Sequence, residues 1–271
     1  MTRSEQVRRT ALVTGASAGI GLAFAHVFAR NGFDLVLTAR RLDRLEALAA
    51  EIRTAQHVIV RVVQEDLADP AAPRRLHDVL SGAGVTIDAL VNNAGYGVAG
   101  RYLASPWERH AAFLQIMVTA VAELTHRFVG PMVDRRYGRI INVASLAGLV
   151  PATAGHTLYA ASKALLIKFS QSLALEVGAH GVHVTALCPG FTYTEFHDVL
   201  GTRDIVRRQL PRWMWMDAET VAHQGFDAVM TGRSVCVTGR VNRSIAFLTR
   251  HLPDGVLQGI AQRQGRKYRR V

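Results

Sequence analysis

Cysteine is scarce in this 271-residue sequence, which contains only Cys188 and Cys236, each inside an apolar segment. Two cysteines support neither a disulfide framework nor a cysteine metal site, so we expect buried, unreactive thiols and no metal centre. Apolar runs are short, and none approaches the roughly 18 residues that a membrane-spanning helix needs. Residues 1–9 are rich in charge and contain no signal-peptide core. These absences predict a soluble, cytoplasmic protein.

Acidic residues are outnumbered, because 21 Asp and Glu stand against 32 Lys and Arg, which gives a net charge of +11. Such an excess raises the question of a nucleic-acid or anionic-membrane partner. Residues 1–9 carry a net +2 and residues 263–271 a net +5, which leaves +4 for the body. We therefore interpret 263–271 as a solvated basic tail and expect no specific nucleic-acid binding. Peripheral membrane contact through this tail is the alternative, and it predicts salt-sensitive binding.

What the sequence does contain is a regular alternation of strand-like and helix-like segments. The expected strands lie at 11–13, 34–40, 57–63, 87–91, 138–144, 182–188 and 235–238. The expected helices lie at 22–31, 41–53, 71–80, 107–134, around 159–177, and at 217–230. This alternation predicts an α/β fold with a doubly wound parallel sheet of about seven strands and helices on both faces. No internal repeat or linker interrupts it, so we expect one domain over residues 1–271.

A glycine-rich turn, Thr14-Gly15-Ala16-Ser17-Ala18-Gly19-Ile20-Gly21, joins the first strand to the first helix. A strand, a glycine turn and a helix in this order place backbone N–H groups and a helix N-terminus against a phosphate. Gly15 allows the tight turn, Gly19 the approach of a pyrophosphate, and Gly21 close packing of helix on strand. Because glycine turns are common in α/β proteins, this turn needs support from its context.

The second expected strand, 34–40, ends where a dinucleotide-binding fold meets the adenosine ribose. A carboxylate at that point binds the ribose 2′-hydroxyl of NAD, whereas arginine accommodates the 2′-phosphate of NADP. Here the strand ends in Arg40 and Arg41, and no acidic residue follows before Asp43. We infer NADP(H) rather than NAD(H). The alternative is that both arginines simply face solvent.

Tyr159 and Lys163 are four residues apart, so on a helix they share one face. An ammonium near a phenol favours the phenolate and lowers the phenol pKa, which fits the phenol for proton transfer. Ser145 follows the strand 138–144 and could hold the oxygen that exchanges the proton. The alternative is an amphipathic helix that carries Tyr and Lys at this spacing by chance. The glycine turn, Arg40 and Ser145 argue against chance, because each follows a strand of the same sheet.

The segment 191–216 differs from the rest, because it lacks periodicity and is rich in large apolar residues, including Phe191, Tyr193, Phe196 and Trp213 to Met216. Long irregular segments beside a site often serve as lids or substrate-binding loops. We therefore expect a substrate-binding lid and an apolar substrate. Core packing of the same side chains is the alternative.

With these residues in place, the chain resembles the short-chain dehydrogenase/reductase family, in its single-domain branch, from about residue 10 to 239. The resemblance rests on five motifs in the family's order: Thr14-Gly15-x-x-x-Gly19-x-Gly21, Asn92-Asn93-Ala94-Gly95, Ser145, Tyr159-x-x-x-Lys163 and Pro189-Gly190-x-x-x-Thr194. It implies a Rossmann-like fold that transfers hydride between a nicotinamide and a small-molecule carbonyl or alcohol substrate. It also implies a homodimer or homotetramer.

The resemblance implies a role for each matching residue. Tyr159 would be the catalytic acid or base, Lys163 would bind the nicotinamide ribose and lower the Tyr159 pKa, and Ser145 would bind the substrate oxygen. The cofactor-binding residues that it implies are Gly15, Ser17, Gly19, Ile20, Gly21, Arg40, Arg41, Asp66, Leu67, Asn93, Ala94, Gly95, Tyr159, Lys163, Pro189, Gly190 and Thr194. Asp66 and Leu67 are the expected adenine contacts.

One position departs from the family pattern. The family has Asn in the long helix before the catalytic Ser, where it supports a proton-relay water beside Lys, and Met117 stands there in this sequence. A thioether cannot replace an amide. In the family that water is held largely by the backbone carbonyl, so we expect slow but real turnover. The competing hypothesis is a dinucleotide-binding sensor or scaffold of the same fold that has lost its chemistry.

Overall fold

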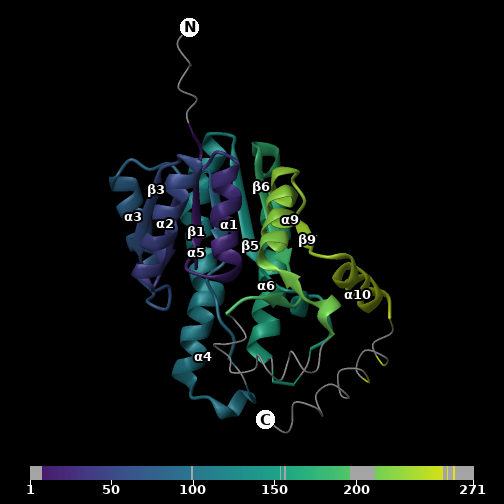
Figure 1. The fold of residues 1–271 in the computed structure, drawn as a ribbon. Helices are drawn as coiled ribbons and strands as arrows, with labels where there is room; N and C mark the ends of the chain where they lie inside the picture. The colour runs from purple at the N-terminus through teal and green to yellow at the C-terminus, as the bar shows by residue number, and fades with distance from the viewer. Residues whose placement is uncertain are drawn as a thin grey trace.

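The computed structural model describes residues 8–98, 100–152, 154–155, 157–195 and 211–252, together with 255 and 259. Residues 1–7 and the basic segment 263–271 lie outside the described residues, as does 196–210 within the expected lid. In the described part, seven parallel strands form one sheet in the order β3-β2-β1-β4-β5-β6-β9 (Figure 1). Their bounds are β1 Thr10–Thr14, β2 Asp34–Ala39, β3 Val60–Gln64, β4 Ala89–Asn92, β5 Gly138–Val143, β6 Val182–Cys188 and β9 Val235–Val237. The predicted fold class is confirmed.

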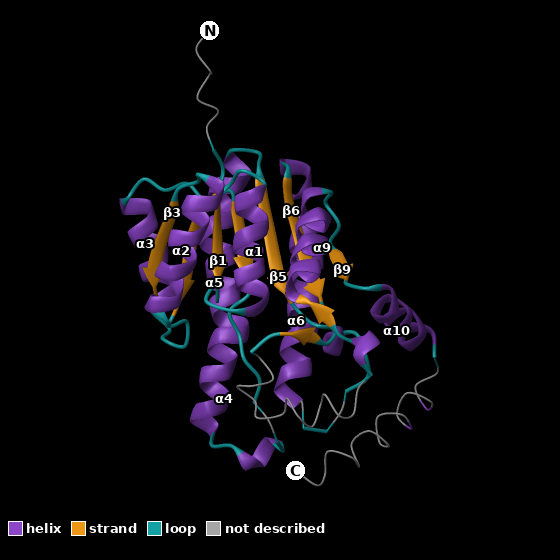
Figure 2. Cartoon of the chain, in the orientation of Figure 1, coloured by secondary structure: helices purple, strands orange, loops and turns teal. Residues whose placement is uncertain are grey.

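Helices cover both faces of the sheet, which is why its central strands are apolar on both sides (Figure 2). One face packs against α1 (Gly19–Arg30), α2 (Leu42–Gln56) and α9 (Ala218–Met230). The other packs against α3 (Ala72–Gly82), α4 (Trp107–Leu114), α5 (Ala120–Asp134) and α6 (Thr157–Val177). A further helix, α10 (Arg240–His251), follows β9. Among the described residues, no helix is both long and apolar enough to cross a membrane.

The strand register brings the carboxyl ends of neighbouring strands to one edge of the sheet. Thr14 at the end of β1 pairs with Thr38, and Asn92 at the end of β4 pairs with Asn142. The segments that follow β1, β2, β4, β5 and β6 therefore emerge side by side. Figure 1 shows that α4 and the start of α6 extend beyond this edge.

A chain of buried side-chain hydrogen bonds fixes the helices beneath that edge. The Asn92 amide donates to Asn142 Oδ1 at 2.8 Å and to Thr125 Oγ1 at 3.1 Å, which joins β4 to β5 and α5. The Asn142 amide donates in turn to Ser170 Oγ at 2.9 Å, and this hydroxyl donates to the Leu166 carbonyl within α6. Because a buried amide without a partner is costly, this chain holds α6 at one height relative to β5.

The expected helix at 107–134 is interrupted. After α4, residues Gln115–Thr119 form a π-helical turn, and α5 continues from Ala120. A period of three to four residues did not reveal the extra residue that a π-helical turn accommodates. Such turns occur often at functional sites, and this one contains Met117.

Candidate functional site

The glycine-rich turn after β1 is tied to the loop after β4 by one hydroxyl and one amide. Thr14 Oγ1 donates to the Val91 carbonyl at 3.1 Å and accepts from the backbone N–H groups of Asn93 and Ala94 at 2.9 and 3.0 Å. The Asn93 amide donates to the carbonyls of Thr14 and Gly15 at 2.9 and 3.2 Å. The expected residues Asn93 and Ala94 thus lie against the turn and hold its shape.

The turn has a shape that glycine alone permits. Gly15 and Gly19 have φ angles of +65° and +57°, in the left-handed region. A Cβ on Gly21 would lie 2.3 Å from the Gly15 carbonyl oxygen and 2.4 Å from Asn93 Nδ2. Helix α1 starts here with no side-chain cap and no acidic residue in its first turn. Its first N–H groups, including that of Ile20, are thus available to an anion, so the residues present fit a dinucleotide pyrophosphate.

Arginine side chains flank this turn. The Arg41 guanidinium donates to Ser17 Oγ from Nη2 at 3.1 Å and from Nε at 3.3 Å. It also donates to the Glu195 carboxylate at 2.9 Å, and Arg44 donates to the other oxygen of that carboxylate at 2.5 Å. Of the two expected arginines, Arg41 reaches the turn. The exposed Arg40 instead follows directly after β2, and its carbonyl accepts a hydrogen bond from the Gln64 amide at 2.7 Å. No motif pointed to Arg44 or Glu195.

The expected adenine contacts lie beyond β3. Asp66 is exposed and its Oδ1 accepts from the backbone N–H of Ala68 at 3.0 Å, while Leu67 is buried. Burial raises the pKa of the neighbouring Tyr96 phenol, and the charges of Arg40 and Asp66 also act on it.

Ser145, Tyr159 and Lys163 come together at the end of β5. Ser145 lies two residues after the end of β5. Its Oγ accepts a hydrogen bond from the Ala147 N–H at 3.1 Å and is also hydrogen-bonded to the Tyr159 hydroxyl. Lys163 is buried, with its Nζ donating to the Val143 carbonyl at 2.6 Å and lying 5.7 Å from the centroid of the Tyr159 ring. The structure thus assembles the three residues that the sequence suggested.

A glycine lets the loop after β5 approach α6 closely. A Cβ on Gly148 would lie 2.7 Å from the backbone nitrogen of Ala164 in α6. Farther along the edge, Pro189 accepts at its carbonyl from the Leu146 N–H at 2.9 Å, and Gly190 leaves room for the Asn242 amide. The expected residues Pro189 and Gly190 therefore border the Ser145 loop.

Burial controls the acid–base properties of these groups. Burial raises the pKa of Tyr159, and the hydrogen bond with Ser145 opposes the rise. Burial lowers the pKa of Lys163 to about 8, and the nearby Cys188 acts in the opposite direction. The net shift of the Tyr159 pKa is therefore upward, opposite to the lowering that we expected from Lys163, because burial is the largest contribution. Both cysteines are buried and unpaired, as predicted, and burial raises the pKa of Cys188 to about 12.

Met117 packs against the loop after β4. It is fully buried within the π-helical turn, and a Cβ on Gly95 would lie 2.7 Å from its Sδ. It also belongs to the apolar core that includes Ile116 and Phe113. The side chain at the position of the family's Asn therefore fills space beside Gly95.

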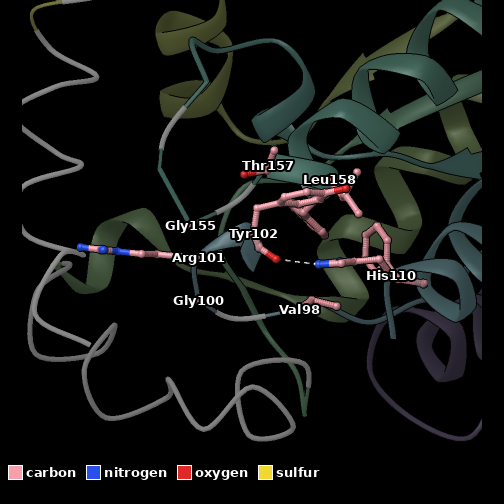
Figure 3. A pocket seen from close by; sticks show the side chains of 10 residues that line it. Val98, Gly100, Arg101, Tyr102, His110, Gly155, Thr157 and Leu158 are labelled. Carbon is pink, nitrogen blue, oxygen red and sulfur yellow. Dashed lines mark hydrogen bonds between the residues drawn. The ribbon is translucent and has the colours of Figure 1, made fainter. Parts of the chain in front are cut away.

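A pocket opens beside Tyr159 and is lined mainly by the loop after β4 and the start of α6 (Figure 3). Its wall includes Val98, Phe113 and Leu158. The buried His110 lies across it, donating from Nε2 to the Tyr102 carbonyl at 2.8 Å and stacking on the Tyr102 ring at 4.7 Å. Sequence reasoning missed His110 and Tyr102, because neither belongs to a motif and their pairing depends on the loop.

The described ends of the segment 191–216 lie next to the glycine turn. Strands β7 (Thr192–Tyr193) and β8 (Met216–Asp217) pair as a small parallel sheet. The Trp215 ring stacks on Tyr193 at 4.9 Å, and a Cβ on Gly19 would lie 3.0 Å from the side chain of Thr194. Tyr193 and Trp213 are 41% and 66% exposed, so these rings are not core residues.

Comparisons with protein-family models and with solved structures point to the same family. A model of the short chain dehydrogenase family matches residues 9–204. A short-chain dehydrogenase from Sphingobium yanoikuyae in complex with NADPH is 32% identical, with 93% of this chain and 94% of that chain covered and a TM-score of 0.79.

Two further solved structures are similar. The bulky-bulky ketone specific alcohol dehydrogenase from Comamonas testosteroni is 29% identical, covering 93% of both chains with a TM-score of 0.76. A short chain dehydrogenase/reductase from Burkholderia phymatum in complex with NAD is 26% identical, covering 89% of this chain and 92% of that chain with a TM-score of 0.78.

The buried ammonium predicts a pH-dependent change in stability. Below about pH 8, Lys163 is charged in both the folded and the unfolded chain, and the folded chain bears the cost of burying the charge. Replacing Lys163 by Met should then raise the free energy of unfolding at pH 7 by about 1–3 kcal/mol. Between pH 8 and 10.5 the folded protein releases this proton before the unfolded chain does, so the unaltered protein gains stability and the advantage of Met shrinks.

Urea unfolding of both proteins from pH 7 to 10 measures this difference. Lys168→Met is the matched control, because Lys168 lies on the same helix and is exposed. It should change the free energy of unfolding by less than about 0.5 kcal/mol at either pH. A Lys163→Met protein that is less stable at pH 7, or equally altered at all pH values, would contradict the assignment.

Proposed function

Because the chain belongs to the short-chain dehydrogenase/reductase family, we propose that it is an NADP(H)-dependent oxidoreductase that acts on a carbonyl or secondary alcohol of an apolar substrate. Oxidoreduction of carbonyl and alcohol groups is the chemistry of the family, and the cofactor preference, the substrate class and the residue roles are our proposal. One observation carries this proposal. The Tyr159 hydroxyl is hydrogen-bonded to Ser145, and Lys163 lies beside the Tyr159 ring, at the sheet edge that holds the glycine turn.

Bound at the glycine turn, the dinucleotide supplies or accepts a hydride at its nicotinamide. Tyr159 then donates its phenol proton to the carbonyl oxygen, which becomes the alcohol hydroxyl, or takes that proton back in the reverse direction. Ser145 donates a hydrogen bond to the same oxygen and stabilises the negative charge that develops there. Because burial raises its pKa, Tyr159 is neutral at pH 7 and available as a proton donor.

The contribution of Lys163 is electrostatic. Its pKa of about 8 leaves most of the lysine protonated at pH 7, and the positive charge within 6 Å of the ring favours the phenolate that remains after proton transfer. The same ammonium would hold the hydroxyls of the nicotinamide ribose. We expect it to turn from the Val143 carbonyl toward these groups when the dinucleotide is bound.

Two arginines support NADP(H) over NAD(H). Arg41 is bonded to Ser17 of the glycine turn, and Arg44 lies one helical turn further on the same side. Guanidinium groups pair well with a 2′-phosphate, whereas a 2′-hydroxyl would be served by a carboxylate. The similar solved structures include complexes with NADPH and with NAD, so the preference rests on these side chains.

Apolar groups beside Tyr159 support the proposed substrate class. Val98, Phe113 and Leu158 line the pocket together with polar residues that include His110 and Thr157. The described ends of the expected lid carry the exposed rings of Tyr193 and Trp213. The alcohol dehydrogenase from Comamonas testosteroni, which acts on bulky-bulky ketones, has a similar fold. We propose a ketone or secondary alcohol flanked by apolar groups, with 191–216 as its lid.

A dinucleotide-binding sensor or scaffold is the second candidate, and Met117 is the observation that favours it. Such a protein would bind NADPH but oxidise it with no aldehyde or ketone. Ser145 is hydrogen-bonded to Tyr159 and Lys163 lies beside the Tyr159 ring, and this arrangement supports the enzyme instead.

Replacing Tyr159 by Phe tests the catalytic role. Loss of the proton donor should lower kcat for NADPH-dependent reduction of bulky ketones by about 10²- to 10⁴-fold, while the Kd for NADPH changes less than about threefold. Tyr137→Phe is the control, since Tyr137 lies before β5 at the opposite edge of the sheet, between Arg9 and Arg139. Turnover retained by Tyr159→Phe would refute the assigned role.

Met117 is tested by Met117→Asn, with Met117→Leu as a control that keeps an apolar side chain. If the relay water rests on backbone, neither change should lower kcat per folded molecule, and Asn could raise it. Burying an amide at a fully buried site should cost about 1–3 kcal/mol of stability, so the folded fraction must be measured alongside kcat. A large loss of kcat in Met117→Asn alone would contradict the proposal.

Assembly into a homodimer or homotetramer is part of the proposal. Large apolar side chains are exposed on α6 and α4, with Leu175, Leu165 and Trp107 at 87%, 46% and 60% exposure. Burying such surface is the usual driving force for association. Light scattering should give at least twice the chain mass of 29.6 kDa, and a monomer at micromolar concentration would contradict this part.

A further inference from the structure

Four charged or polar side chains form a compact cluster on the exposed side of the glycine turn. Arg41 binds Ser17 Oγ and the Glu195 carboxylate, and Arg44 binds the second oxygen of the same carboxylate. The carboxylate is thus shared between two guanidinium groups. Two bonds to one anion, with a hydroxyl alongside, are also what a phosphate monoester would require.

The position of Glu195 is set by the chain before it. Strand β7 ends at Tyr193, and the next residue, Thr194, packs against Gly19 of the glycine turn. Glu195 is therefore delivered to Arg41 and Arg44 from a segment some 150 positions later in the sequence. The carboxyl pKa is lowered by Arg44 first and by Arg41 second, so Glu195 is charged at neutral pH.

We propose that Glu195 competes with the 2′-phosphate of NADP(H) for Arg41 and Arg44, and that Arg44 is a second ligand of that phosphate. A 2′-phosphate displaces the Glu195 carboxylate, because two negatively charged groups that bind the same guanidinium groups repel each other. A 2′-hydroxyl has no negative charge and leaves the two ion pairs in place. Glu195 therefore weakens the binding of the phosphorylated dinucleotide selectively. The inference rests on the proposed use of NADP(H).

The expected size of the effect is modest. All three side chains are 41–45% exposed, and ion pairs at such exposure are weak and screened by salt. Breaking two of them reduces affinity by about three- to tenfold at low ionic strength. The effect on a ligand without the 2′-phosphate should be less than about twofold.

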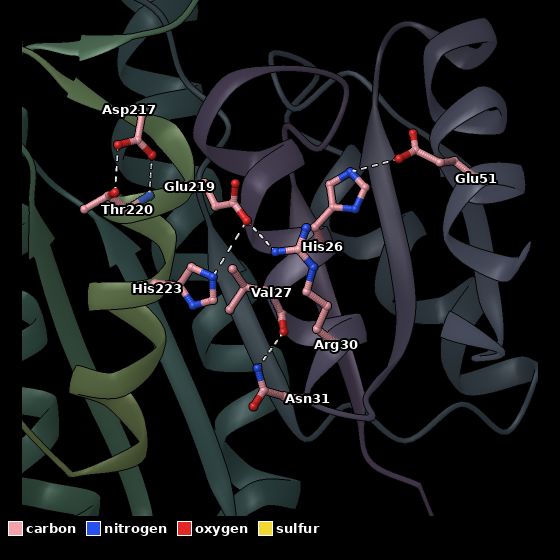
Figure 4. Close-up of polar contacts among 9 residues, drawn as sticks. All are labelled: His26, Val27, Arg30, Asn31, Glu51, Asp217, Glu219, Thr220 and His223. Atoms are coloured by element: carbon pink, nitrogen blue, oxygen red, sulfur yellow. Dashed lines mark hydrogen bonds and ion pairs between the residues drawn. The ribbon is translucent and has the colours of Figure 1, made fainter. Parts of the chain in front are cut away.

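Calorimetric titration with 2′,5′-ADP and with 5′-AMP measures this selectivity without turnover. Glu195→Gln should bind 2′,5′-ADP about three- to tenfold more tightly and 5′-AMP with little change. Glu219→Gln is the matched control, because Glu219 on α9 also pairs with an arginine, Arg30 of α1, and lies near His223 (Figure 4). It removes the same charge from the protein at another place and should alter neither affinity.

The role of Arg44 is tested in the same titrations. Arg44→Gln should weaken the binding of 2′,5′-ADP by about three- to tenfold. Adding Glu195→Gln to this variant should raise the affinity for 2′,5′-ADP by less than it does in the unaltered protein. The gain in 2′,5′-ADP affinity that Glu195→Gln brings should also shrink as the salt concentration is raised.

Three outcomes would overturn the inference: unchanged or weaker 2′,5′-ADP binding in Glu195→Gln, an equal gain in Glu219→Gln, or a loss of 5′-AMP affinity in Glu195→Gln. The last would mean that Glu195 accepts a hydrogen bond from the ribose. If the unaltered protein binds neither 2′,5′-ADP nor NADPH, the proposed cofactor is wrong as well. If it binds both and Glu195→Gln changes nothing, only the present inference fails.

Discussion

The hydroxyl of Thr14 is the contact on which the rest of the site depends. It bonds three backbone groups of the strand and loop at β4, and the Asn93 amide closes the link by binding back to the turn. Without this link, the left-handed glycines would leave the turn free to take many conformations. With it, the N-terminus of α1 is held open at the edge where Ser145 and Tyr159 meet. A dinucleotide at the turn would therefore extend toward groups already held in place.

The part of the sheet edge that carries Ser145, Tyr159 and Lys163 is built at some expense to stability. Lys163 is buried with a single backbone acceptor, which lowers its pKa to about 8, and Tyr159 is kept neutral by burial. The hydrogen bonds from Asn92 to Ser170 fix α6, and Gly148 lets α6 approach the loop after β5 closely. A rigid scaffold thus holds an unfavourable charge beside a phenol. A local loss of folding stability of this kind is common at functional sites, where activity and stability make different demands.

The sequence predicted the fold and the glycine turn well because both are local. Strand periodicity, the turn Gly15 to Gly21 and the four-residue spacing of Tyr159 and Lys163 are set by neighbours along the chain, and all were found where expected. The π-helical turn around Met117, the stacking of His110 and the pairing of Glu195 were missed. Each of these depends on how distant segments pack, which periodicity and motif spacing do not encode.

The arginines show how a rule based on one strand end can leave out a residue that the fold brings to the same place. The end of β2 was read as a 2′-phosphate site because two arginines and no acid follow it. An acid is nevertheless present, since Glu195 reaches the same guanidinium groups from beyond β7. Charge preference at a ribose site is therefore a property of the folded surface and not of one strand end. A neutral 2′-hydroxyl and a charged 2′-phosphate would meet the same arginines, but only the phosphate would have to displace a carboxylate first.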